Sequence, residues 1–269
     1  MAEITITGSP EYQDSIKPLL KAIETNAVGK VILRAIENTG KDKVLTIGPY
    51  TKGNDAIGYC NALTTARDPA AAYPKGVRPD PNVTAPAIRG AFIGRDDDLF
   101  TRDRDERYDQ QPAGFIGTGA GSSADIEFSP ENWGASPKSC YAGFPAALPD
   151  EVLFHEIVHG LRDLQGVRNP WPTEDKDYGN DEEYLAIVTT NVYISAKPST
   201  QLRANADGHW PLKPPLNTSA GFLSDGRNLR LLNIYQLAWR PTFFELAQVS
   251  AASFNPFREL WSQISYLYN

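Results

Sequence analysis

The sequence predicts a single α+β domain, with a small N-terminal sheet and a C-terminal half dominated by helices. Apolar residues alternate in short stretches at 3–7, 43–47 and 124–128, as they do in strands. After residue 149 they recur mostly at helical spacing. The chain has 269 residues, of which 41% are hydrophobic and 22% charged, a balance that suits one globular domain over 1–269.

The predicted helices begin and end at residues that favour a helix terminus. Pro149 suits the first position of a helix, and Asp150 and Glu151 complement its positive end. Gly166 is a suitable stop for this helix, and Asn180 can cap the next one, which Pro198 ends. The other helices are expected at about 10–27, 31–40, 227–239, 242–250 and 256–267, the last three within a C-terminal helical extension at 225–269.

Two stretches lack helical or strand periodicity. Residues 51–113 are rich in Pro, Gly, Asp and Arg, and they predict a long surface excursion because they lack the apolar residues of a core. Residues 117–121 are dense in glycine but carry no Lys-Ser/Thr pair for a phosphate. We interpret them as a flexible turn that leads into the strand at 124–128.

Charge and cysteine content limit the classes of partner. The net charge is −7 and Lys and Arg are dispersed, which argues against a nucleic-acid partner. No apolar stretch is long enough for a membrane span, and the first residues show no classical signal peptide. In such a chain we expect Cys60 and Cys140, the only cysteines, to be reduced thiols rather than a disulfide.

The pattern His-Glu-x-x-His at 155–159 is the most informative segment. His155 and His159 are one helical turn apart, so both imidazoles project from one face and can bind one metal ion. Glu156 lies beside them, where it can accept a proton from water activated by zinc. The alternative is an amphipathic helix whose histidines happen to share a side, although two of the three histidines in the chain fall in this pattern. The segment predicts a catalytic zinc site.

A catalytic zinc site needs a third protein ligand. No further histidine follows within 160–166, as a metzincin would require, and Cys140 lacks the setting of a deformylase-like cysteine. Gluzincins use a glutamate on the following helix. We prefer Glu183, because Ala186 one turn later would let the two helices pack closely, and because many gluzincin-like enzymes show this Glu-x-x-Ala arrangement. Glu182 is the alternative; otherwise we expect it only to complement the positive helix end.

Peptide hydrolysis also needs donors that stabilise the oxyanion. Several polar side chains after the motif could serve, and the sequence does not choose between them. A histidine beside Trp and Pro is more often a packed or surface residue, and Tyr193 could face either a cleft or the core. The candidates are Tyr178, Tyr184, Tyr193, Arg203 and His209.

Taken together, these features resemble the NleD-like effector zinc endopeptidases, gluzincin-type toxins that bacteria deliver through specialised secretion systems. The resemblance spans roughly 3–200 and depends on the glycine-rich lead into 126–130, the segment Phe154–Leu161 and the Glu182-Glu183 pair. Only the His-Glu-x-x-His segment is specific. The resemblance implies a zincin-like metallopeptidase fold, with Zn²⁺ held by His155, His159 and Glu183.

We therefore expect a zinc-dependent endopeptidase that is a secreted effector or toxin, with Glu156 as general base. Its partners would be a protein or peptide substrate and a secretion chaperone or other delivery partner. It would leave its cell without a classical signal peptide and act inside a target cell; the alternative is a cytoplasmic location. The strand at 124–128 could pair with an extended substrate. The rival functions are a zinc amide hydrolase acting on cell-wall peptide and a non-catalytic protein with a structural zinc.

Overall fold

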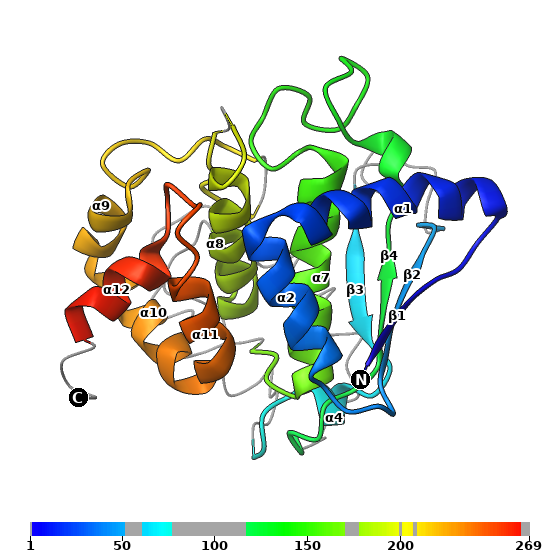
Figure 1. Ribbon diagram of the computed structural model, residues 1–269, viewed down its shortest axis with the longest axis horizontal. Helices are drawn as coiled ribbons and strands as arrows, with labels where there is room; N and C mark the ends of the chain where they lie inside the picture. Colours follow the sequence, from blue (N-terminus) through cyan, green and yellow to red (C-terminus); the bar gives the residue numbers. More distant parts are fainter. Residues whose placement is uncertain are drawn as a thin grey trace, which may run out of the picture.

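The computed structural model describes residues 2–51, 61–76, 117–169, 178–198, 201–206 and 209–264. Within these residues a small sheet lies on one side of the molecule and a helical half on the other (Figure 1). This arrangement confirms the predicted mixed α+β class. The elements are β1 (Glu3–Ile6), α1 (Pro10–Thr25), α2 (Ala27–Glu37), β2 (Val44–Gly48), β3 (Leu63–Ala66), α4 (Pro69–Ala72), β4 (Ala124–Glu127), η1 (Pro130–Asn132), α7 (Pro149–Gln165), α8 (Asp181–Ser195), α9 (Ser219–Ser224), α10 (Gly226–Ala238), α11 (Arg240–Ala247) and α12 (Pro256–Ile264).

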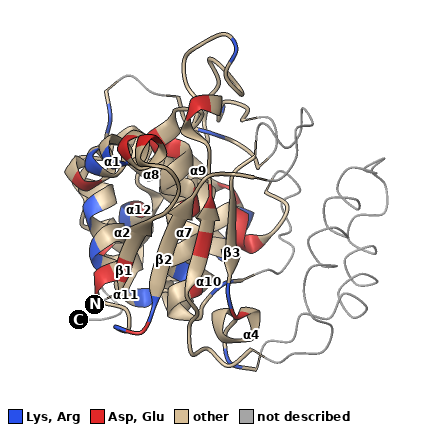
Figure 2. Ribbon diagram, turned by 90° about the vertical axis from the view of Figure 1, so that its right-hand side faces the viewer, with Lys and Arg blue, Asp and Glu red and all other residues tan. Residues whose placement is uncertain are grey.

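The sheet has four strands in the order β1-β2-β4-β3. β1, β2 and β4 are parallel, whereas β3 runs antiparallel to β4. Leu45, Ile47, Ala124 and Ile126 alternate with more exposed residues and are buried, so one face of the sheet packs on the helices. Figure 2 shows the molecule from the side of the sheet, where Lys and Arg are scattered over several elements.

The position of β4 corrects one expectation. β4 lies between β2 and β3 and is hydrogen-bonded to both, so it has no edge with which to pair a substrate peptide. Among the described strands, β3 is the edge on this side of the sheet. A substrate that adds a strand would therefore pair with β3.

The stretch at 51–113 is more than the predicted surface excursion. Residues 63–66 form the edge strand β3, and α4 follows directly. The strand escaped detection because Leu63, Thr64, Thr65 and Ala66 do not alternate in polarity, although their burial does. Segments 52–60 and 77–113 of the stretch lie outside the described residues.

The predicted helices are present, with ends shifted by a few residues. Asn26 separates α1 from α2, and its side chain accepts a hydrogen bond from the Val28 amide at 2.8 Å. Gly166 ends α7 in the left-handed conformation, with φ of 69°. The prediction omitted α9, a helix of 6 residues. No described helix is long and apolar enough to cross a bilayer.

Helix α7 lies between the sheet and α8 (Figure 1). Gly160 permits this packing, since a Cβ there would lie 2.5 Å from Leu45 Cδ1 on β2. The predicted close packing of α8 on α7 is also present, and Ala186 is fully buried. The glycine-dense stretch packs against the end of α7 as well, because a Cβ on Gly121 would lie 2.0 Å from the Leu164 carbonyl oxygen.

The cysteines differ from the expectation of reduced thiols. Cys140 is disulfide-bonded, and it is buried beside Trp133, with which it forms an isolated β-bridge. Cys60, the other cysteine of the sequence, lies outside the described residues. The prediction failed because a sequence pattern does not show which cysteines the fold brings together.

Candidate metal centre

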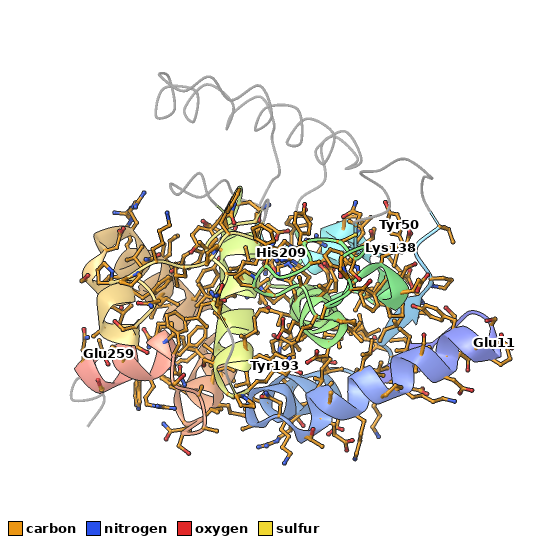
Figure 3. All side chains as sticks on the ribbon, turned by 90° about the horizontal axis from the view of Figure 1, so that it is seen from above. Glu11, Tyr50, Lys138, Tyr193, His209 and Glu259 are labelled. Atoms are coloured by element: carbon orange, nitrogen blue, oxygen red, sulfur yellow. The ribbon has the colours of Figure 1, made fainter. Side chains whose placement is uncertain are left out.

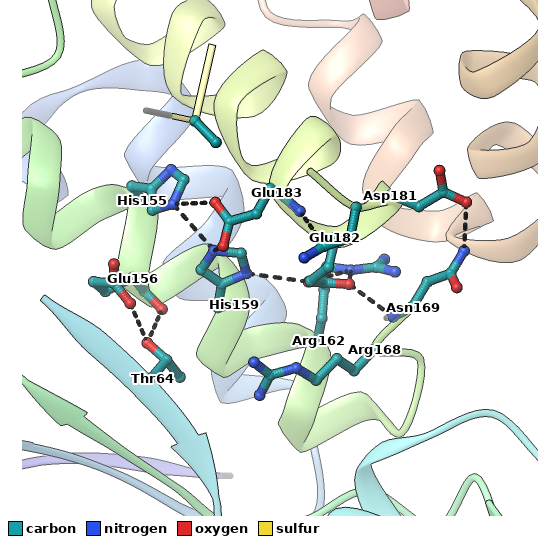
Figure 4. A network of polar contacts seen from close by, with 12 residues as sticks. Thr64, His155, Glu156, His159, Arg162, Arg168, Asn169, Asp181, Glu182 and Glu183 are labelled. Carbon is teal, nitrogen blue, oxygen red and sulfur yellow. Dashed lines mark hydrogen bonds and ion pairs between the residues drawn. The ribbon is translucent and has the colours of Figure 1, made fainter. Parts of the chain in front are cut away.

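His155, His159 and Glu183 converge at one point between α7 and α8 (Figure 4). The two histidines are one turn apart on α7, and Glu183 lies in the first turn of α8. Asn180 caps α8 by accepting a hydrogen bond from the Glu183 amide at 2.8 Å, which fixes the backbone of that residue. Among the described residues, this is the one group of three or more His, Cys, Asp or Glu side chains close enough to hold a metal ion.

The distances between the three groups suit a tetrahedral zinc ion. Ligand atoms about 2.0–2.2 Å from such an ion are separated from one another by about 3.3–3.6 Å. Glu183 carboxylate oxygens lie 3.3 Å from His155 Nε2 and 3.5 Å from His159 Nε2. The two Nε2 atoms are 3.0 Å apart, slightly below that range. The donor set of two imidazoles and one carboxylate is also that of a catalytic zinc site with one open position.

The charges around this point favour a cation. Burial lowers the pKa of His155, which leaves its imidazole neutral. Burial alone would raise the pKa of Glu183, but His159 and His155 outweigh it and hold that pKa well below the usual value. Burial alone would likewise lower the pKa of His159, yet the carboxylates of Glu183 and Glu182 raise it to about 10. A metal ion can replace the proton that His159 would otherwise keep.

Glu156 is buried one residue after the first histidine and is tied to the sheet. Its carboxylate accepts a hydrogen bond of 2.7 Å from the Thr64 hydroxyl on β3, which also lies 3.1 Å from the Glu156 carbonyl oxygen. A hydroxyl has one proton, so it donates to one of these oxygens at a time. Thr64 was missed because no sequence signal marked β3. It fixes the Glu156 carboxylate relative to the edge strand.

Glu182 corrects another expectation, because it does not merely complement the end of α8. Its side chain is 4% exposed. Its carboxylate accepts hydrogen bonds of 2.8 Å from Arg162 Nε and from the Asn169 amide, and it lies 3.4 Å from His159 Nδ1. Burial alone would raise the pKa of Glu182, but Arg162 and His159 lower it to about 2.

The charged Glu182 carboxylate determines the tautomer of His159. A carboxylate only accepts hydrogen bonds, so Nδ1 of His159 must carry the proton on that side. The lone pair of the neutral ring then lies on Nε2, the atom that faces Glu183 and His155. Glu182 therefore prepares His159 to be a metal ligand although it is not a ligand itself.

Several of the expected oxyanion donors contact other groups of the protein. The Tyr193 hydroxyl donates to Asp150 at 2.7 Å, and its ring stacks on Phe154, so Tyr193 faces the core. The Tyr184 hydroxyl is 3.4 Å from the Asn228 carbonyl, and the Tyr178 ring packs edge-on against Tyr184 at 4.9 Å.

Arg203 and His209 lie in the segment that follows α8. The Arg203 guanidinium donates to the carbonyls of Asn205, at 2.6 Å, and Ala206. His209 lies well away from Tyr193 in Figure 3, and Tyr193 lies at the α1–α2 junction.

His209 is held as a neutral imidazole. Nδ1 lies 2.9 Å from the Pro145 carbonyl oxygen, which only accepts, so Nδ1 carries the proton. Burial, followed by the charge of Arg203, lowers the pKa of His209 to about 2. The lone pair then lies on Nε2, which accepts hydrogen bonds in this tautomer. His209 is buried, so of the two expected alternatives it is a packed rather than a surface residue, and in this tautomer its Nε2 is an acceptor rather than an oxyanion donor.

His209 also belongs to a cluster of strained backbone. Among the described non-glycine residues, those with positive φ are Tyr141, Ala146 and His209, at 49°, 55° and 51°. They lie together, because the Tyr141 and His209 rings stack at 4.4 Å and His209 bonds the carbonyl that precedes Ala146. Such strain costs about 1–3 kcal/mol per residue and is concentrated at functional sites.

One comparison with known proteins identifies a family for this chain. The profile of the Peptidase M91 family, described as effector protein, matches residues 1–201. The matched region extends from β1 through α8 and contains all the residues that converge on the candidate metal position. Helices α9 to α12 lie beyond it. No curated protein and no solved structure matches the chain.

Proposed function

Because the chain belongs to the Peptidase M91 family of effector proteins, we propose that it is a zinc-dependent endopeptidase with Glu156 as general base. Family membership makes it a protease that acts on a protein substrate, and it agrees with the resemblance to NleD-like effectors. The observation that carries the zinc assignment is the convergence of one ligand atom each from His155, His159 and Glu183, all within 4.8 Å of one another.

The residues around this point can perform peptide hydrolysis. A bound zinc ion would supply Lewis acidity, which polarises a carbonyl and lowers the pKa of water. Glu156 takes a proton from the attacking water and passes it to the leaving amine. Thr64 orients the Glu156 carboxylate. Thr64→Val should therefore lower kcat about tenfold, the loss of one hydrogen bond to a charged group, with zinc content unchanged. An unchanged kcat would remove Thr64 from the proposal.

The substrate in this proposal pairs with the edge of β3 that no other described strand covers. One edge of β3 is hydrogen-bonded to β4, and Thr64 links the strand to the helix that carries the general base. An extended peptide added there would gain main-chain hydrogen bonds beside Glu156. This antiparallel edge strand next to the metal helix is also the feature that supports a zincin-like fold.

The strained cluster of Tyr141, Ala146 and His209 is proposed as a wall of the substrate site. His209 Nε2 is an acceptor, which suits the N–H group of a substrate peptide. His209→Phe, which removes the acceptor but keeps a ring beside Tyr141, should then raise KM more than it lowers zinc affinity, measured by peptide kinetics and chelator competition. Equal losses in both would assign the residue to the metal site instead.

The effector description supports delivery into a target cell through a secretion system. The secretion chaperone or other delivery partner stays a prediction. A non-catalytic protein with a structural zinc would have no use for Glu156, which argues against that alternative.

The decisive experiment compares the purified chain with its Glu156→Gln variant, which should bind zinc equally well. Both are incubated with a cell lysate, and new protein termini are mapped. Termini that require zinc and Glu156 support the proposal. Cleavage of cell-wall peptides without any new protein termini would favour the amide hydrolase.

A further inference from the structure

Arg162 is a buried cation that is connected to the candidate metal position through two residues, Glu182 and His159. It lies on α7 and is 1% exposed. Its Nε donates to both carboxylate oxygens of Glu182 at 2.8 Å, and Nη2 donates to the Val167 carbonyl at 2.5 Å. Glu182 in turn faces His159 Nδ1 at 3.4 Å. The orientation of His159 therefore depends on where Arg162 holds Glu182.

Two aromatic rings of the C-terminal helices hold Arg162. Its guanidinium carbon lies 5.4 Å from the centre of the Tyr235 ring and 5.3 Å from that of Trp239. Both separations are within the range of cation–π attraction, which is stronger for a desolvated cation. Tyr235 is on α10, and Trp239 follows its last residue.

Each of these rings is itself anchored beside the metal-binding helices. The Trp239 indole Nε1 donates to Gln165 Oε1, the last residue of α7, at 2.7 Å. The Tyr235 hydroxyl donates to the carbonyl of Asp181, the first residue of α8. Tyr235 and Trp239 thus contact α7, α8 and the cation between them.

We propose that Tyr235 and Trp239 are positioning residues of the metal centre, which they support through Arg162 and Glu182. This inference rests on the proposed zinc site. Both residues lie beyond the 1–201 region that the family profile matches. The C-terminal helices of this chain would then be part of the machinery that sets zinc affinity, not an appended layer.

The test measures zinc affinity by chelator competition and the visible spectrum of the cobalt-substituted protein. Loss of an outer partner of a ligand typically lowers metal affinity about 10–100-fold. Because Trp239 acts through two intermediates, we expect Trp239→Leu to weaken zinc binding about tenfold, at the low end of this range, and to change the cobalt spectrum. Arg162→Lys keeps the charge but loses the planar guanidinium, so it should have a similar effect.

Conservative variants separate positioning from folding. Trp239→Phe and Tyr235→Phe keep a ring over Arg162 but lose the hydrogen bonds to Gln165 and to the Asp181 carbonyl, so each should retain more zinc affinity than the matching leucine variant. The matched control is Phe244→Leu, which removes a ring from another cation–π pair, 5.4 Å from Arg240, in the same C-terminal half. Denaturation of the zinc-free variants gives the stability cost of each.

The inference holds if Trp239→Leu loses zinc affinity while Phe244→Leu, at a comparable stability cost, keeps it. Equal zinc affinities in the two variants would overturn it, and so would a Trp239→Phe variant as defective as Trp239→Leu. If Trp239→Leu does not fold, the zinc affinities of Arg162→Lys and Tyr235→Leu are compared with that of Phe244→Leu instead. Lower affinity in these two variants supports the inference, and equal affinity overturns it. If the original chain binds no zinc at all, the proposed function fails first, and this inference fails with it.

Discussion

His155 and His159 lie one turn apart on α7, and their Nε2 atoms face the same point, but their Nδ1 atoms have different surroundings. Nδ1 of His159 faces Glu182, which Arg162 and Asn169 hold. Nδ1 of His155 is buried without a hydrogen-bond partner among the described residues. A charged network thus orients His159, whereas no described hydrogen bond holds the Nδ1 side of His155. Two histidines of one motif can therefore depend on different parts of the fold.

The largest effect should follow from removing either ligand. His155→Ala and His159→Ala each leave two protein ligands, so each should lower zinc affinity by more than the ~10–100-fold that an outer partner contributes. Metal analysis of the purified variants should give well below one zinc per chain. Full zinc occupancy in both would contradict the site assignment.

Glu156 is not a proposed metal ligand, so its replacement should lower kcat without lowering zinc binding. Glu156→Gln cannot accept a proton, and kcat should fall by about 10²–10⁴, the usual contribution of a general base. Zinc content and the circular dichroism spectrum should match those of the original chain. Near-normal turnover by this variant would show that another group is the base.

Replacing Glu183 and replacing Glu182 should lower zinc affinity by different amounts. Glu183→Ala removes a ligand and should lose zinc almost as fully as the histidine variants. Glu182→Ala should lower zinc affinity by about 10–100-fold, more than the few tenths of a kcal/mol that a helix end alone would cost. Chelator competition on both variants ranks them. A Glu182→Ala variant with unchanged affinity would show that the network around His159 is only structural.

The smallest effect is a difference in proton release. At pH 8 the zinc-free His159, with a pKa of about 10, carries a proton that zinc must displace, whereas His155, whose pKa is lowered from the ordinary value, does not. Zinc binding at pH 8 should therefore release about one proton, and affinity should rise with pH up to about 10. Calorimetric titration in buffers of different ionisation enthalpy measures this number. Release of no proton would contradict the asymmetry.

The same shifts fix the sign of the pH dependence of folding. The pKa of Glu182 is lowered to about 2 in the folded chain, so its contribution is complete above the unfolded value of about 4.3 and is lost as pH falls toward 2. His159 has a raised pKa, so without zinc its contribution is complete below about 6.5 and is lost as pH rises through about 10. Glu182→Gln should make the acid limb of urea-unfolding free energies between pH 5 and 3 shallower, while Glu183, whose pKa is also lowered, keeps its own contribution.

Local signals predicted the parts of the site that lie on single helices. The His-Glu-x-x-His spacing, the Gly166 stop and the Asn180 cap each depend on neighbours within a turn or two. The same signals placed Glu183 at the start of α8, where it now faces both histidines.

The remaining contacts depend on the tertiary fold. Thr64 meets Glu156 across 92 residues of sequence, and its strand shows no alternation in polarity. The role of Glu182 required the position of Arg162 on another helix, and the sequence showed only an acidic helix end. Whether Cys140 is bonded also depends on how distant segments meet.

Gly160 has a consequence for how the enzyme sets its geometry. It follows His159 directly, and its missing side chain lets α7 approach Leu45 on β2 to within the thickness of a methyl group. Because β2, β4 and β3 are hydrogen-bonded neighbours, the position of α7 on β2 also affects where the β3 edge lies relative to the histidines. The close approach at Gly160 is therefore one of the contacts that set the distance between this edge and the candidate metal position. A residue of any larger size at 160 would alter the gap across which a peptide must reach the metal.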